Sequence, residues 1–188
     1  NVKKYMLRLF LFAIISEIPF NLIMGSSVFY PFHQNVLWTF LLGVLSIQII
    51  EKAKKKQKKW ISFFVVCLVL LMDFLLGTIT MVDYNAAGIL TVLLFYFFRK
   101  KTWISFAAQL VGLYYLNVVM LGNLYYPVTI LGHHFEIAQQ SFALLALIPI
   151  WLYHGEQGYH SKWFKYFCYA FYPVHLLILV VIWQWRIR

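Results

Sequence analysis

Long apolar runs separated by short polar connections make up almost the whole chain. A helix needs roughly 20 apolar residues to cross a hydrocarbon core about 30 Å thick. Seven runs reach or approach this length, with approximate bounds Tyr5–Met24, Asn35–Ile50, Trp60–Val82, Asn85–Phe98, Trp103–Leu121, Ile137–Tyr153 and Trp163–Trp185. We expect the first to be broken late by Pro19, because proline disrupts a helix interior. The pattern predicts an all-α, polytopic transmembrane helical bundle of about seven segments.

Composition supports this class and excludes a soluble protein. The chain is 63% hydrophobic and only 12% charged, whereas soluble domains carry about 25% charged residues. Its formal net charge of +10 would indicate a nucleic-acid partner in a soluble protein. Here the basic residues form short clusters between apolar runs, so the expected partner is the lipid bilayer and not nucleic acid.

The basic clusters fall on alternate connections. Three Lys or Arg lie before or at the start of the first run, six between the second and third, three between the fourth and fifth, and two before or at the start of the seventh. The intervening connections hold none. Because cytoplasmic loops are enriched in Lys and Arg, we expect a cytoplasmic N-terminus and an outside C-terminus. Residues 1–188 are expected to form a single transmembrane domain.

Two further features of the sequence bear on its context. Residue 1 is Asn and not Met, so we expect the chain to be the C-terminal part of a longer protein. The two cysteines, Cys67 and Cys168, each lie inside an apolar run and suggest neither a disulfide framework nor a zinc site. We expect them to be small core residues.

Three ionisable side chains fall inside predicted segments at similar depths: Glu17, Asp73 and His175. Facing lipid would cost each about 2.5 to 3.5 kcal/mol on insertion scales, so a shared interior site is the economical interpretation. Alternatives remain open for all three. A neutral carboxyl hydrogen-bonded in helix packing is favoured for Asp73 and is the less favoured alternative for Glu17, which lies beside Ser16 and Pro19. His175 is also explained by packing at a kink beside Pro173.

A second group of polar residues gathers at the predicted outer ends of the segments, at Gln34, Asn35, Asp83, Gln139 and Gln140. Helix capping is an alternative for Asn35 and for Asn85. Capping alone does not explain the two adjacent glutamines. The nearby histidines and glutamate, His133, His134 and Glu136, have no recognised metal-ligand spacing, and no metal is expected.

The predicted inner face is basic. Six lysines between Glu51 and Lys59, with Arg99, Lys100 and Lys101, suit either a polyanionic ligand such as a nucleotide cofactor or anionic lipid headgroups. The inner loop Tyr153–Gly158 has two glycines three apart, which permit a backbone close to a ligand, and a titratable pair, His154 and Glu156. A plain turn needs only the glycines.

Several strings together resemble the TraX family of membrane proteins. They are Ser16-Glu17-Ile18-Pro19-Phe20, Gln34-Asn35-Val36, Asp83-Tyr84, Gln140-Ser141-Phe142, Tyr153-His154-Gly155 and Phe171-Tyr172-Pro173-Val174-His175. The resemblance runs almost the full length. Family members usually have glycine at the position of Asn85 and asparagine at that of His154. They also begin with two further segments, the first carrying an Asp-His pair, and we expect both to be missing from this sequence.

The resemblance implies a transmembrane acyltransferase in a bacterial cell membrane. The family's namesake acts in N-terminal acetylation of conjugative pilin, and related transmembrane enzymes take acetyl from cytoplasmic acetyl-CoA. The acceptor would be an amine or hydroxyl of a pilin-like N-terminus or a cell-surface molecule. Non-enzymatic alternatives are a small-molecule transporter, a non-catalytic membrane scaffold, or a pilus-assembly partner that acts only by binding.

These two lines together give a set of expected site residues. His175 is the expected base or acetyl carrier, aided by Glu17, although the missing Asp-His pair is an equally good candidate for the base. The acceptor is expected at Gln34, Asn35, Asp73, Asp83, Gln139, Gln140 and Tyr172. The acyl donor is expected on the cytoplasmic side at His154, Gly155, Gly158 and Lys162.

Overall fold

The computed structural model describes residues 1–122, 124–130, 133–156, 158–159 and 161–187. Its backbone contacts divide the chain into two compact units. The first comprises Asn1–Ile89 together with Gln157–Arg188, and the second comprises Leu90–Glu156.

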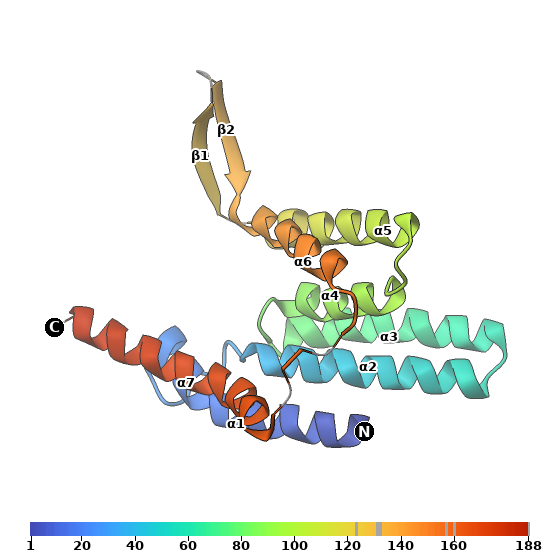
Figure 1. The fold of residues 1–188 in the computed structure, drawn as a ribbon, viewed down its shortest axis with the longest axis horizontal. Coiled ribbons are helices and arrows are strands. Elements are labelled where there is room, and N and C mark those ends of the chain that lie inside the picture. Colours follow the sequence, from blue (N-terminus) through green and yellow to red (C-terminus); the bar gives the residue numbers. More distant parts are fainter. Residues whose placement is uncertain (123, 131–132, 157, 160, 188) are drawn as a thin grey trace. The chain divides into compact units, whose positions relative to one another are not determined.

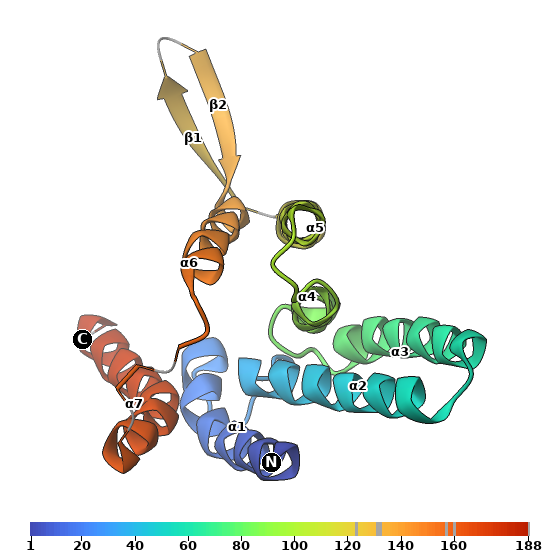
Figure 2. The same cartoon turned by 45° about the vertical axis from the view of Figure 1, so that its right-hand side comes forward.

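The first unit is built from four long helices and the start of a fifth. Their bounds are α1 Val2–Gly25, α2 Val36–Lys56, α3 Lys59–Ile79, α4 Asn85–Phe97 and α7 Lys162–Ile187. Helix α1 packs against both α7 and α2, and α2 packs against α3 (Figures 1 and 2). The α1–α7 contact includes a stacked aromatic pair, Phe12 and Tyr169, and a hydrogen bond from Arg8 Nη1 to the Tyr169 hydroxyl of 3.0 Å.

Proline does not interrupt α1. The expected late break at Pro19 was wrong, because the helix continues through this residue to Gly25. Helix α7 likewise continues through Pro173. Proline is tolerated in membrane-spanning helices, since neighbouring groups and small local adjustments satisfy the carbonyl that it leaves without a donor.

A short connection joins α3 to α4 and brings the two helices close together. Gly77 is buried near the end of α3, where a Cβ atom would lie 2.7 Å from the backbone Cα of Ala86. Real Cβ atoms do not approach backbone so closely, so only glycine fits here. The contact fixes the α3–α4 turn, which carries Asp83.

The second unit contains helices and a hairpin. Its elements are α5 Trp103–Tyr114, a π-helical turn Tyr115–Met120, strands β1 Tyr125–Ile130 and β2 His133–Ala138, the 3-10 helix η2 Gln139–Ala146 and α6 Leu147–Leu152. Buried Gln109 connects three segments of this unit. It donates to the carbonyl of Phe98 at 2.8 Å and accepts from Trp151 Nε1 at 2.8 Å.

Five helices in the described part of the chain are long and apolar enough to cross a membrane. They correspond to the first, second, third, fifth and seventh expected segments. The fourth is only 13 residues long, and the sixth is divided between η2 and α6. The structure therefore supports a multi-pass membrane protein but does not confirm seven crossings.

The hairpin corrects the expectation of an all-α fold. Strands β1 and β2 pair antiparallel, from Tyr125 opposite Ala138 to Ile130 opposite His133. The sequence of β1, Tyr-Tyr-Pro-Val-Thr-Ile, consists mainly of aromatic and β-branched residues that favour strands. We had expected a loop here and a helix from Ile137; Ile137 instead lies in β2.

The two cysteines are exposed on the helix surfaces, so their expected place in the core was wrong. An apolar run in a membrane protein does not reveal which of its residues face neighbouring helices. The outward faces of the spanning helices also carry many exposed large apolar side chains. Such surface is expected where lipid and not water is the surrounding solvent.

Candidate active site

The carboxylate of Glu17 forms the centre of a polar cluster in the first unit. Its Oε2 atom accepts a hydrogen bond from Trp38 Nε1 at 2.9 Å and another from Asn35 Nδ2. Both donors come from the first turn of α2, which packs beside α1. Two donors on one oxygen fix the carboxylate in a single orientation.

Asn35 both caps a helix and contacts Glu17. Its side-chain oxygen accepts from the backbone N–H of Leu37 at 3.1 Å, which is the capping role that the sequence left open. Its amide nitrogen also donates to the Ala13 carbonyl at 2.9 Å. Asn35 is fully buried. Its side chain therefore joins the start of α2 to the polar side of α1.

Trp38 is a member of the cluster that sequence reasoning missed. It lies three residues after Asn35, so one helical turn brings the two side chains to the same face. An indole N–H is a donor only and requires an acceptor when it is shielded from water. The sequence signal that could have identified Trp38 is its position three residues after the capping residue Asn35.

The α3–α4 turn adds Asp83 to the same region. The residues before α2 and before α4 pair in a short backbone bridge, with Gln34 N–H donating to Met81 O and Asp83 N–H donating to Gln34 O, both at 2.9 Å. Thr39 Oγ1 donates to the Asp83 carbonyl at 2.8 Å. The side chain of Gln34 turns away and donates to the Pro31 carbonyl at 3.0 Å.

The Asp83 carboxylate pairs with a histidine. His33 Nε2 lies 3.3 Å from Asp83 Oδ1, and the His33 ring stacks on Phe20 with ring centroids 5.5 Å apart. Burial raises the pKa of Asp83 above its usual value, while the hydrogen bond and charge of His33 and the backbone N–H of Tyr84 act in the opposite direction. Burial, followed by the charge of Asp83, also raises the pKa of Tyr84.

The backbone of this turn is unusual. Tyr84 has φ of 61° and Asn85 has φ of 47°, both in the left-handed region. Asparagine tolerates this conformation, but a bulky residue such as tyrosine adopts it only under constraint. Asn85 is therefore a residue type suited to the turn. Strained backbone of this kind concentrates at functional sites.

Helix α7 brings Tyr172 to the cluster. Its phenol group lies close enough to the start of α2 and to Glu17, Asp83 and Tyr84 to interact electrostatically with them. Four residues expected at the site from sequence, Glu17, Asn35, Asp83 and Tyr172, thus meet where α1, α2, α7 and the α3–α4 turn come together.

His175 lies one turn beyond Tyr172 on α7. Its Nδ1 atom is 2.7 Å from the Tyr172 carbonyl, and its ring stacks on Phe171 with centroids 5.3 Å apart. A carbonyl oxygen only accepts, so Nδ1 carries the proton of the neutral imidazole. The lone pair is then on Nε2, which is the atom that can take a proton from a substrate.

Two buried oxygen atoms beside the cluster have no hydrogen-bond partner within the described residues, Glu17 Oε1 and Ser16 Oγ. Ser16 is fully buried. A buried polar atom without a partner costs roughly 1 to 3 kcal/mol. An incoming amine or hydroxyl that donates to Glu17 Oε1 removes this cost, so the arrangement suits a polar substrate group.

Asp73 does not join this cluster. Ser46 Oγ of α2 donates to its Oδ1 at 2.7 Å, and the residue is 3% exposed between α2 and α3. This placement favours the helix-packing alternative. Its role as a substrate-binding residue stays a prediction.

The remaining expected residues fall in other parts of the chain. Gln139 and Gln140 open η2 in the second unit, where Gln139 N–H donates to the Leu124 carbonyl at 2.8 Å. His154 and Gly155 also belong to the second unit, whereas Gly158 and Lys162 belong to the first. His154, Gly155, Gly158 and the first residue of α7, Lys162, are all exposed, and Gln157 lies outside the described residues.

The expected donor loop has one distinctive backbone feature. Gly155 has φ of 83°, a backbone conformation that residues other than glycine rarely adopt. A Cβ atom added there would have no neighbouring atom within 4 Å. The Tyr153 hydroxyl donates to the Glu156 carbonyl at 3.0 Å across the turn. The glycine is therefore explained by turn geometry, and a ligand role for the loop stays a prediction.

Replacing Asp83 by Asn is expected to change how stability depends on pH. A carboxyl whose folded-state pKa is raised stabilises the folded state below its unfolded pKa, about 3.9, and this contribution is lost as pH rises through the folded pKa. From pH 4 upward, the melting temperature of the wild type should therefore fall relative to that of Asp83→Asn. Thermal unfolding in detergent at a series of pH values measures the difference.

The groups that interact with Asp83 are His33, Tyr84 and Tyr172, and all remain in this variant. Glu136→Gln on the exposed face of β2 is the matched control, and its melting temperature should follow the wild type at every pH. A constant difference between wild type and Asp83→Asn across the series contradicts the prediction.

Comparison with known proteins identifies the family to which the chain belongs. The family model described as TraX protein matches residues 1–183, which include every element of both units up to the C-terminal part of α7. No curated protein and no solved structure gives a match. The resemblance expected from the short strings is thereby confirmed, and the chain belongs to the TraX family.

Proposed function

We propose that this protein is a membrane-bound acyltransferase that moves acetyl from acetyl-CoA to an amine or hydroxyl acceptor. The observation that carries the proposal is the Glu17 carboxylate. One of its oxygens is held by Asn35 and Trp38, and the other is buried without a partner among the described residues. Such an oxygen is suited to binding and orienting the group that is to be acetylated.

The proposed reaction uses the two titratable groups in different roles. An amine acceptor donates one N–H to Glu17 Oε1 and gives a second proton to His175 Nε2 as its nitrogen attacks the acetyl carbonyl carbon, whereas a hydroxyl acceptor gives its only proton to His175 Nε2 as its oxygen attacks. The new C–O or C–N bond forms and the thioester C–S bond breaks. The imidazolium returns its proton to the leaving thiolate, so that the products are the acetylated acceptor and free CoA.

The basic connections support a donor on the cytoplasmic side. A CoA molecule carries several phosphates, and the lysine-rich end of α2 offers charge of the opposite sign. We propose a location in the bacterial plasma membrane with this end in the cytoplasm, as the charge alternation indicates. The acceptor is proposed to be a pilin-like N-terminus or a cell-surface molecule.

Transport or scaffolding is the second candidate. It is favoured by Asp73 and His175, because one atom of each side chain is hydrogen-bonded within helix packing, Asp73 Oδ1 with Ser46 and His175 Nδ1 with the Tyr172 carbonyl. A transporter or scaffold does not need acetyl-CoA. Binding of the acyl donor therefore separates the two candidates.

The full-length protein purified in detergent is expected to be stabilised by acetyl-CoA and to release free CoA from it slowly. At a donor concentration of 100 times Kd, the free energy of unfolding rises by about 2.7 kcal/mol. Thermal unfolding and a thiol-release assay measure the two effects. Acetylcholine, an acetyl ester without a nucleotide, serves as the control ligand. Absence of both effects would favour transport or scaffolding.

A further inference from the structure

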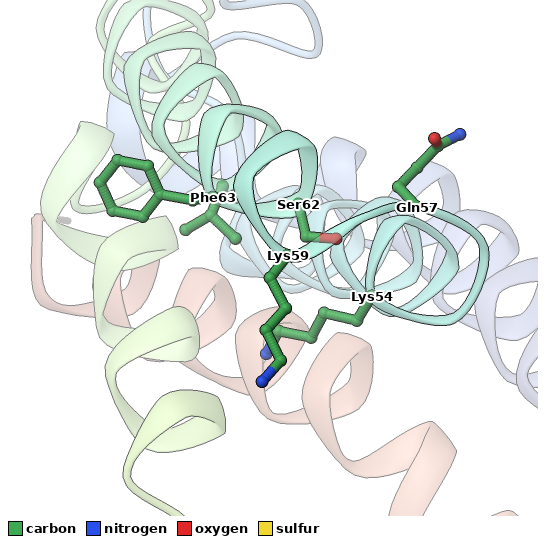
Figure 3. A pocket seen from close by; sticks show the side chains of 6 residues that line it. Lys54, Gln57, Lys59, Ser62 and Phe63 are labelled. Atoms are coloured by element: carbon green, nitrogen blue, oxygen red, sulfur yellow. The ribbon is translucent and has the colours of Figure 1, made fainter.

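A pocket at the α2–α3 turn combines lysines near the end of α2 and the start of α3 with apolar residues of α3. It encloses about 300 Å³ and is lined by Lys54 and Gln57 from the end of α2 and by Lys59, Ser62, Phe63 and Val66 from α3 (Figure 3). All six residues belong to the first unit.

The polar part of the pocket is cationic. The side chains of Lys54 and Lys59 extend to the same side, whereas Gln57 extends away from them (Figure 3). Two ammonium groups at one site attract an anion with more than one negatively charged oxygen, such as a phosphate. Lys55 and Lys56 belong to the same run but do not line the pocket.

The pocket wall is a fixed structure. Ser62 is 9% exposed, and its hydroxyl donates to the Ala53 carbonyl at 3.1 Å. This bond joins the first turns of α3 to the end of α2, so that the two lysine-bearing segments keep their spacing. A run of lysines on a mobile tail would have no such constraint.

The apolar part of the pocket follows α3 into its membrane-spanning stretch. Phe63 and Val66 lie four and seven residues after Lys59, which places the three side chains along one helix face. The rise from Lys59 to Val66 is about 10 Å. The pocket is therefore charged at one end and apolar at the other. A phospholipid has the same order, with its charged headgroup at one end and its acyl chains at the other.

We propose that this pocket binds an anionic phospholipid, with the phosphate between Lys54 and Lys59 and an acyl chain against Phe63 and Val66. A soluble phosphate would share the contacts with the lysines. The lipid is favoured because Phe63 and Val66 lie on a helix of membrane-spanning length. Their apolar side chains can contact an acyl chain but make no favourable contact with a soluble anion. The inference goes beyond the proposed function and does not depend on acyl transfer.

Replacing both pocket lysines tests the charged part. Full-length protein in detergent is titrated with phosphatidylglycerol, and bound lipid is counted by native mass spectrometry. Lys54→Gln with Lys59→Gln is expected to weaken binding about tenfold or more. The matched control, Lys55→Gln with Lys56→Gln, removes the same charge from the same run and should change binding less than twofold. Equal losses in both pairs would show diffuse attraction only and overturn the proposal.

The apolar part has an equally close control. Phe63 and Phe64 are neighbours that are 64% and 63% exposed, but only Phe63 lines the pocket. Phe63→Ala should weaken phosphatidylglycerol binding several-fold more than Phe64→Ala does; equal effects would contradict the acyl-chain contact. Inorganic phosphate should compete poorly with the lipid. Competition at matched concentrations would identify a soluble-anion site and overturn the assignment to a phospholipid.

Discussion

Glu17→Gln is expected to lower acetyl transfer by about a hundredfold in the full-length protein, because misplacing a reacting group by about 1 Å costs a factor of about 10² in rate. The amide keeps the shape of the carboxylate, and its oxygen can still accept from Trp38 and Asn35. What it loses is the negative charge and one acceptor oxygen. Transfer is measured as the initial rate of CoA release in the presence of acceptor.

A matched control distinguishes the effect of losing the Glu17 charge from the effect of losing any carboxylate charge. Glu51→Gln removes a carboxylate near the opposite end of α2 and should leave the rate within twofold of wild type. Thermal unfolding of both variants shows whether either has lost its fold. If Glu17→Gln is folded and transfers acetyl at the wild-type rate, Glu17 is not part of the chemistry.

The helices that cross a membrane were predictable because length and apolarity decide them. The part of the chain that the structure describes has five helices of that kind, at the positions of the first, second, third, fifth and seventh apolar runs. The segments that differ, α4 and the region from Tyr125 to Leu152, are those in which the apolar run is short or contains aromatic and β-branched residues. Such runs suit a strand, a buried helix or a half-inserted helix, and periodicity alone does not choose among them.

The site was predictable to the extent that polar residues are costly in lipid. Glu17, Asn35, Asp83 and Tyr172 were all expected at the site, and the structure brings them together. Cost alone does not identify a partner, however. Asp73 is as expensive in lipid as Glu17. Its Oδ1 accepts from Ser46 on the adjacent helix while its Oδ2 has no partner among the described residues, and nothing in the spacing of Ser46 and Asp73 along the chain indicates this contact.

Long-range partners were the part that the sequence left open. Trp38 contributes to the cluster through an N–H that only the packing of α1 on α2 brings to Glu17. The His33–Asp83 pair joins two loops 50 residues apart along the chain. Contacts of this kind depend on helix rotation and loop conformation, which hydrophobic patterning fixes only approximately.

Replacing His175 is expected to have an effect as large as that of Glu17→Gln, and the choice of replacement distinguishes its two roles. The side-chain amide of asparagine can reproduce the Nδ1–H donor that meets the Tyr172 carbonyl, but it has no counterpart of Nε2. If Nε2 is the base, His175→Asn should transfer acetyl about a hundredfold more slowly while its melting temperature stays near the wild-type value.

The alternative, in which His175 only packs beside Pro173, makes the opposite prediction. In that case the contribution of His175 is the hydrogen bond between its Nδ1 and the Tyr172 carbonyl. His175→Asn should then retain both stability and transfer, whereas His175→Ala should lose stability through the lost bond and the lost stacking on Phe171. Added imidazole provides a further distinction: it should partly restore transfer in His175→Ala if the ring supplies a base. A folded His175→Asn with wild-type transfer would exclude His175 as the base and transfer that role to another residue of the full-length protein.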